Sequence, residues 1–151
     1  MSRVVFLDAG PIGLVTNPKL SPESTLCTRW LQTLITSNIR VIIPEIADYE
    51  VRRELVRAKK VNSIKMLDQL IRNPLIKYLP ITTSAMQLAA ELWAQARNRG
   101  MTTAHPMSLD GDVILAAQVL SAGYSPADFV IATSNVTHLS QFAPSALWDS
   151  I

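Results

Sequence analysis

The fold is decided near the start of the chain, in the stretch Val4-Val5-Phe6-Leu7-Asp8-Ala9-Gly10-Pro11. Four consecutive apolar residues, two of them β-branched, are typical of a strand that is buried on both faces, as in a parallel sheet. The run stops at Asp8, and Gly10-Pro11 is a turn signal. A carboxylate therefore stands at the carboxyl end of a strand that we expect to be central, at the rim where open α/β sheets bind ligands. The alternative is that Asp8 only caps a following helix or turn.

Length and composition restrict the class of protein. The chain has 151 residues, and we expect residues 1–151 to form a single domain with a substantial core. Apolar residues make up 48% and charged residues 17%, which excludes a disordered chain. No apolar run has the length of a membrane span or of a signal peptide, and the single cysteine, Cys27, cannot form an internal disulfide. We therefore expect a cytoplasmic protein with no membrane partner, in which Cys27 is a packing residue.

Short apolar runs alternate with segments of helical periodicity along the chain. Further strands are expected at residues 40–44, 76–79 and 129–133, with an edge strand near 146–148. Helices are expected at residues 21–37, from 45 onward, at 64–71, at 83–100 and from about 110 to 123, with an irregular segment at 101–107. This alternation predicts an α/β layer sandwich with a largely parallel sheet.

Oxygen-bearing side chains gather at the rim where Asp8 is expected. Strand ends and the helix starts that follow them share this rim in a parallel sheet. The other residues predicted to lie there are Glu50, Asp110, Asp112, Thr133 and Asn135. A carboxylate buried without a partner is costly, and Mg²⁺, which prefers oxygen ligands, is a suitable partner.

Each of these residues also has a plain structural interpretation. A helix cap would explain Asp110 or Asp112, a surface charge would explain Glu50, and an ordinary turn would explain Asn135. A zinc site is not indicated, because the two histidines have no ligand spacing to each other or to Cys27.

Basic residues are concentrated in one segment. Half of the fourteen lie between residues 52 and 72, namely Arg52, Arg53, Arg57, Lys59, Lys60, Lys65 and Arg72. Such a patch suits a polyanion, and the alternative is a solvated helix face. No aromatic residue is interleaved in it, so base stacking is not indicated.

Four short motifs follow one another along nearly the whole chain. They are Val5-Phe6-Leu7-Asp8; Ile43-Pro44 with Glu50-Val51-Arg52; Asp112-Val113-Ile114-Leu115-Ala116-Ala117; and Ile131-Ala132-Thr133-Ser134-Asn135-Val136 with His138 just after. In their order and spacing they resemble the motifs of PIN-domain ribonucleases, in particular the VapC-type toxins of bacterial toxin–antitoxin pairs. The resemblance implies a PIN-like three-layer α/β/α sandwich with a central, mainly parallel sheet.

The resemblance also implies a site and a reaction. In that family the positions of Asp8, Glu50 and Asp112 form the acidic cluster that holds Mg²⁺ or Mn²⁺ for hydrolysis of RNA phosphodiester bonds. The positions of Thr133 and Asn135 complete the site.

Two positions depart from the family pattern. The family often has Asp at the position of Asn135, so this chain either binds metal more weakly or relies on Asp110. Pro44-Glu45 replaces a commoner small polar residue after the second strand, which leaves Glu45 as a rival to Glu50.

The partners that follow are an RNA substrate, a cognate antitoxin protein and a second copy of the chain in a homodimer. The RNA backbone would be held through phosphate contacts by Arg52, Arg53, Arg57, Lys59 and Lys60.

Other classes of protein remain as alternatives. The first is a non-catalytic PIN-like module that binds RNA or a protein. A phosphatase of the haloacid dehalogenase type would need a second Asp at the position of Gly10, and a receiver domain would need a Lys after a late strand. A dinucleotide-binding fold lacks its glycine-rich turn here.

Overall fold

A single parallel sheet forms the centre of the molecule in the computed structural model, which describes residues 3–100 and 106–151. Its strand order is β3-β2-β1-β4-β5, and all neighbouring pairs are parallel. The strands are β1 (Val4–Leu7), β2 (Arg40–Pro44), β3 (Ile76–Leu79), β4 (Phe129–Thr133) and β5 (Ser145–Leu147). The central position and complete burial of β1 confirm the prediction made from its apolar run.

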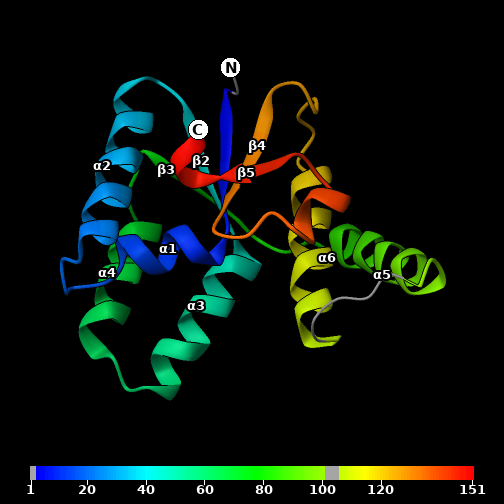
Figure 1. Cartoon of the computed structure of the whole chain (residues 1–151), viewed down its shortest axis with the longest axis horizontal. Coiled ribbons are helices and arrows are strands. Elements are labelled where there is room, and N and C mark those ends of the chain that lie inside the picture. The colour runs from blue at the N-terminus through cyan, green and yellow to red at the C-terminus, as the bar shows by residue number, and fades with distance from the viewer. Residues whose placement is uncertain (1–2, 101–105) are drawn as a thin grey trace.

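Helices cover both faces of the sheet, as Figure 1 shows, with α1 to α4 on one side and α5 and α6 on the other. Their bounds are α1 (Ala9–Val15), α2 (Pro22–Thr36), α3 (Glu45–Arg57), α4 (Val61–Ile71), α5 (Thr83–Asn98) and α6 (Pro106–Leu120), with 3₁₀ turns η1 (Leu139–Gln141) and η2 (Trp148–Ser150). Alternate residues of β1 enter different cores: Val5 and Leu7 pack on the first side, whereas Val4 and Phe6 pack on the second. This is the expected three-layer sandwich.

The structure differs from the sequence-based expectation in having a helix, α1, that was not expected, and in the starts of α4 and α6, which lie before their expected positions. Helix α1 begins directly after Asp8 and includes Gly10-Pro11, because proline is tolerated in the first turn of a helix. Helix α6 begins at Pro106, so Asp110 and Asp112 lie inside it rather than at its cap. Of the segment expected to be irregular, residues 101–105 lie outside the described part of the chain, and residues 106 and 107 are helical.

Cys27 is fully buried between α2 and the sheet, as expected of a packing residue. Within residues 3–100 and 106–151, no helix has the length and apolar character needed to cross a membrane.

Candidate functional site

A pocket of about 330 Å³ opens at the carboxyl ends of β1 and β4. The chain leaves β1 toward β2 and β3 on one side, while β4 and β5 lie on the other, so the pocket stands at the topological switch point of the sheet. The residues that line it are Asp8, Ala9, Gly10, Glu50, Ser108, Asp112, Thr133, Ser134, Asn135 and His138. The three acids of the expected cluster therefore share one pocket.

Asp8 is held by two hydrogen bonds. Leu7 is in register with Ala132, so the residues that follow them, Asp8 and Thr133, meet at the same rim. Thr133 Oγ1 donates to Asp8 Oδ2 at 2.7 Å, and the backbone N–H of Ala9 donates to Asp8 Oδ1 at 2.7 Å. Asp8 thus caps α1 and also lines the pocket, so its role as a cap does not exclude a role in the site.

Glu50 reaches the pocket from α3, which follows β2 without a loop. The buried side chain of Gln118 ties α3 to α6: its Oε1 accepts from the N–H of Ile46 at 3.0 Å, and its Nε2 donates to the carbonyl of Leu79 at 2.9 Å. This bridge fixes the helix of Glu50 against the helix of Asp112.

The pocket raises the pKa of all three acids. Burial is the main cause for Asp8, opposed by its hydrogen bonds from Thr133 and Ala9. Burial and then the charge of Asp8 raise the pKa of Glu50 to about 7, with Asp112 adding to the effect and Arg53 opposing it. Burial and then Asp8 raise the pKa of Asp112 to about 6. Burial and the mutual repulsion of the acids thus disfavour their charged forms, and a bound cation would offset both effects.

The donor set fits a hard divalent cation such as Mg²⁺ or Mn²⁺, because carboxylate oxygens of three residues face one pocket. In the described residues, no three His, Cys, Asp or Glu side chains already stand where one ion could be ligated directly. Small side-chain movements, or water between carboxylate and ion, would be required, and Mg²⁺ commonly retains several waters in protein sites.

The other candidate ligands lie differently. Asp110 does not line this pocket; it is exposed and borders a groove between α5 and α6 beside Trp93. The carboxylate of Glu45 accepts the N–H of Ile81 at 2.7 Å, so it stabilises the end of β3. Asn135 lines the pocket, but its Oδ1 accepts the N–H of Thr137 at 3.0 Å. The structure thus brings Glu50, rather than Glu45, to Asp8.

Comparison with known proteins rests on structure alone, since no model of a protein family and no curated protein matches the sequence. A chain of VapBC2 from Rickettsia felis, solved with a DNA fragment from its promoter, superposes with a TM-score of 0.71 at 14% identity, over 97% of this chain and 99% of that one. A chain of VapBC-1 from nontypeable Haemophilus influenzae gives 0.67 at 14% identity, over 97% and 98%. This chain therefore shares the fold of these two VapBC chains, which agrees with the expected PIN-like α/β/α sandwich. The resemblance found in the four motifs is confirmed at the level of fold.

Several residues of the acidic pocket were given no role from the sequence. Gly10, Ser108, Ser134 and His138 line it together with the acids. A Cβ at Gly10 would collide with the side chain of Ser134, so the glycine allows α1 to lie against the loop after β4. Only the tertiary contact reveals this requirement, because Gly10-Pro11 is equally typical of a turn.

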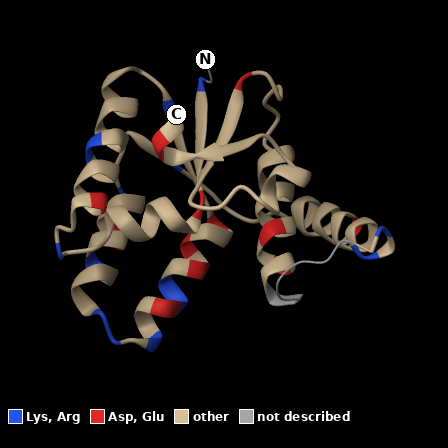
Figure 2. Cartoon of the chain, in the orientation of Figure 1, with Lys and Arg blue, Asp and Glu red and all other residues tan. Residues whose placement is uncertain are grey.

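The expected RNA-binding residues divide into two groups. Arg52 has a structural role: it forms ion pairs with Asp48 at 3.1 Å and with Asp68 at 2.8 Å, and the second pair links α3 to α4. Arg53, Arg57, Lys59 and Lys60 are exposed on α3 and the following turn. Figure 2 shows basic residues on α3, interspersed with acidic ones, and at the turn into α4.

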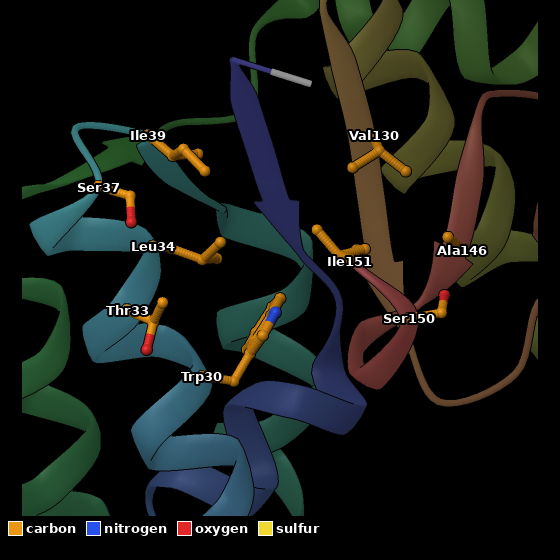
Figure 3. A pocket seen from close by; sticks show the side chains of 9 residues that line it. All are labelled: Trp30, Thr33, Leu34, Ser37, Ile39, Val130, Ala146, Ser150 and Ile151. Carbon is orange, nitrogen blue, oxygen red and sulfur yellow. The ribbon is translucent and has the colours of Figure 1, made fainter. Parts of the chain in front are cut away.

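A separate apolar cavity of about 400 Å³ lies between α2 and the strands β4 and β5 (Figure 3). Side chains such as Trp30, Leu34, Val130 and Ile151 point into it, and none of the described residues that line it is acidic or basic. Its apolar lining does not suit phosphodiester chemistry, whereas the acidic pocket brings three carboxylates together and is the candidate active site.

Proposed function

We propose that this chain is a metal-dependent endoribonuclease that hydrolyses RNA phosphodiester bonds with Mg²⁺ or Mn²⁺. One observation carries the proposal: Asp8, Glu50 and Asp112 line a single pocket at the switch point of a PIN-like sheet, and the charge of Asp8 raises the pKa of both other acids.

The protein residues have distinct roles in this proposal. Asp8, Glu50 and Asp112 would hold the ion, and Thr133 would orient the carboxylate of Asp8 through its 2.7 Å hydrogen bond. The bound ion would supply Lewis-acid stabilisation of the scissile phosphate and a lowered pKa for the attacking water.

The exposed basic residues would hold the substrate beside this pocket. Arg53 belongs to the same helix as Glu50 and lies 4.0 Å from its carboxylate, so the basic surface adjoins the acidic pocket. Arg57, Lys59 and Lys60 extend it toward the turn into α4. Contacts from these side chains to phosphates would give affinity without sequence preference.

We further propose that the chain is the toxin of a toxin–antitoxin pair in the cytoplasm. The support is the fold shared with chains of two VapBC structures. A cognate antitoxin is the partner that this proposal requires, and co-purification with the product of an adjacent reading frame would test it.

A homodimer is part of the same proposal. Leu26 on α2 and Val61 on α4 are 57% and 59% exposed, and such apolar side chains suit a contact with a second copy. Sedimentation should show a dimer at micromolar concentration, and substitution of Leu26 by Lys should shift the protein toward monomer.

The experiment that tests the nuclease proposal is RNA cleavage by metal-free protein with Mn²⁺ added back. Wild type should cut only with Mn²⁺ and stop on addition of EDTA, and Asp8→Asn should not cut. Asp110→Asn removes a charge from the same helix as Asp112 but outside the pocket, so it should cut like wild type. Cleavage by Asp8→Asn at the wild-type rate would reject the proposal in favour of a binding module.

A further inference from the structure

Gly111 lies on α6 beside the carboxylate of Glu50. A Cβ at this position would lie 3.0 Å from Glu50 Oε2 and 3.2 Å from both Cδ and Oε1. The 3.2 Å separation from Cδ is shorter than the optimal distance of about 3.5–4.0 Å between non-bonded carbons, so a Cβ would fit only tightly against Glu50. Any side chain at residue 111 would therefore compete with Glu50 for the same space.

Backbone conformation does not account for this glycine. The glycines with positive φ in the described part of the chain are Gly100 and Gly123, whereas Gly111 lies inside α6. Glycine is a poor residue for the interior of a helix, since alanine restricts the unfolded chain more and is favoured in helices. What Gly111 provides is the absence of a side chain.

We infer that Gly111 is a positioning residue, which seats the carboxylate of Glu50 beside Asp112 in the pose that binds the metal. This inference rests on the proposed function. An Ala at this position would require the carboxylate of Glu50 to move by a few tenths of an ångström, and Arg53 Nη2, 4.0 Å from Glu50 Oε2, offers a partner on the side away from the pocket. Glu50 would then form a surface ion pair instead of facing the pocket.

The test is calorimetric titration of Mn²⁺ into wild type, Gly111→Ala and a matched control, Gly13→Ala. Gly13 is also helical, and a Cβ there would meet no atom within 4 Å. Both variants should keep or raise the melting temperature, by roughly 2–4 °C for a chain of this size. Only Gly111→Ala should weaken Mn²⁺ binding, by about 10- to 100-fold, as loss of a residue that orients a ligand does.

A second background isolates the steric cause. Glu50→Asp shortens the side chain, so its carboxylate no longer reaches residue 111. In that background Gly111→Ala should produce no further loss of Mn²⁺ affinity. An equal loss in both backgrounds, or a melting temperature well below that of wild type, would show a general packing role and overturn the inference.

A readout in metal-free protein separates this inference from the proposed function. The carboxyl carbon resonance of Glu50 should shift in Gly111→Ala and stay in place in Gly13→Ala. If wild type bound no Mn²⁺ but the resonance shifted in Gly111→Ala, the metal proposal would fail, whereas the positioning of Glu50 by Gly111 would be supported. If the resonance did not move, the positioning role of Gly111 would be rejected whatever the metal affinity.

Discussion

The hydroxyl of Thr133 donates a 2.7 Å hydrogen bond to Asp8 Oδ2 and so joins the ends of β4 and β1, 125 residues apart in the chain. This bond lowers the pKa of Asp8, against the larger effect of burial. It also fixes the direction of the carboxylate, while the other oxygen is held by the N–H of Ala9. Thr133 therefore orients Asp8, and its hydroxyl also accepts the N–H of Asn135 at 3.2 Å.

Thr133→Val should weaken Mn²⁺ binding by about 10- to 100-fold, because it keeps the shape of the side chain and removes the group that orients Asp8. Thr16→Val is a matched control: Thr16 is also buried, and its hydroxyl donates to the carbonyl of Ile12 at 2.8 Å, away from the site. Each variant should lose about 0.5–1.5 kcal/mol of unfolding free energy. Equal Mn²⁺ affinity of the two variants would contradict the orienting role.

The pH dependence of the unfolding free energy should reveal the raised pKa of Glu50. The pKa of Glu50 rises from its ordinary value of 4.5 to about 7 in the metal-free fold. The folded state then binds a proton more tightly than the unfolded state, so this contribution to stability is complete below about pH 4 and is lost as pH rises through 7. Denaturant unfolding of wild type and Glu50→Gln should show wild type losing stability, relative to the variant, from pH 4 to pH 7. A constant difference would refute the raised pKa.

Substitutions of the neighbouring residues Arg52 and Arg53 on α3 should have different effects, one on stability and the other on RNA binding. Arg52→Ala should cost about 1–3 kcal/mol of unfolding free energy, because the buried Asp48 loses its charged partner. Arg53→Ala should change stability by less than about 0.5 kcal/mol, since its side chain is 47% exposed. It should instead weaken RNA binding and reduce the slope of affinity against salt. A salt slope unchanged in Arg53→Ala would remove this surface from the RNA site.

Asn135→Asp should strengthen Mn²⁺ binding. Asn135 lines the pocket, and one oxygen of the new carboxylate could still accept the N–H of Thr137 while the other faces the acids. An added ligand charge raises affinity for a divalent cation. Calorimetry would measure the change; a weaker Mn²⁺ affinity would mean that this position does not face the ion.

The strands could be predicted because a buried strand appears in the sequence as a short run of apolar residues. Residues 4–7 are apolar without interruption, and β1 is buried along its whole length. Helix α1 could not be predicted in the same way, since Gly10-Pro11 is equally typical of a turn and a first helical turn.

The site was predictable in part. Asp110 and Asp112 are two residues apart, and residues at that spacing point to different sides of a helix, so only one of them could face the pocket. Which one depends on how α6 packs against α5 and the sheet. Likewise, the carboxylate of Glu45 accepts a hydrogen bond from the N–H of Ile81, which lies 36 residues later in the chain. No local sequence pattern reveals this contact.

The most direct test of the central claim, that Asp8, Glu50 and Asp112 hold one divalent ion, is calorimetric titration of Mn²⁺ at pH 7 in two buffers of different ionisation enthalpy. Wild type should bind one ion and release protons, because the pKa values of Glu50 and Asp112 are raised to about 7 and about 6 in the metal-free state. Asp8→Asn should bind far more weakly. Absence of Mn²⁺ binding by wild type, or equal affinity of wild type and Asp8→Asn, would contradict the account.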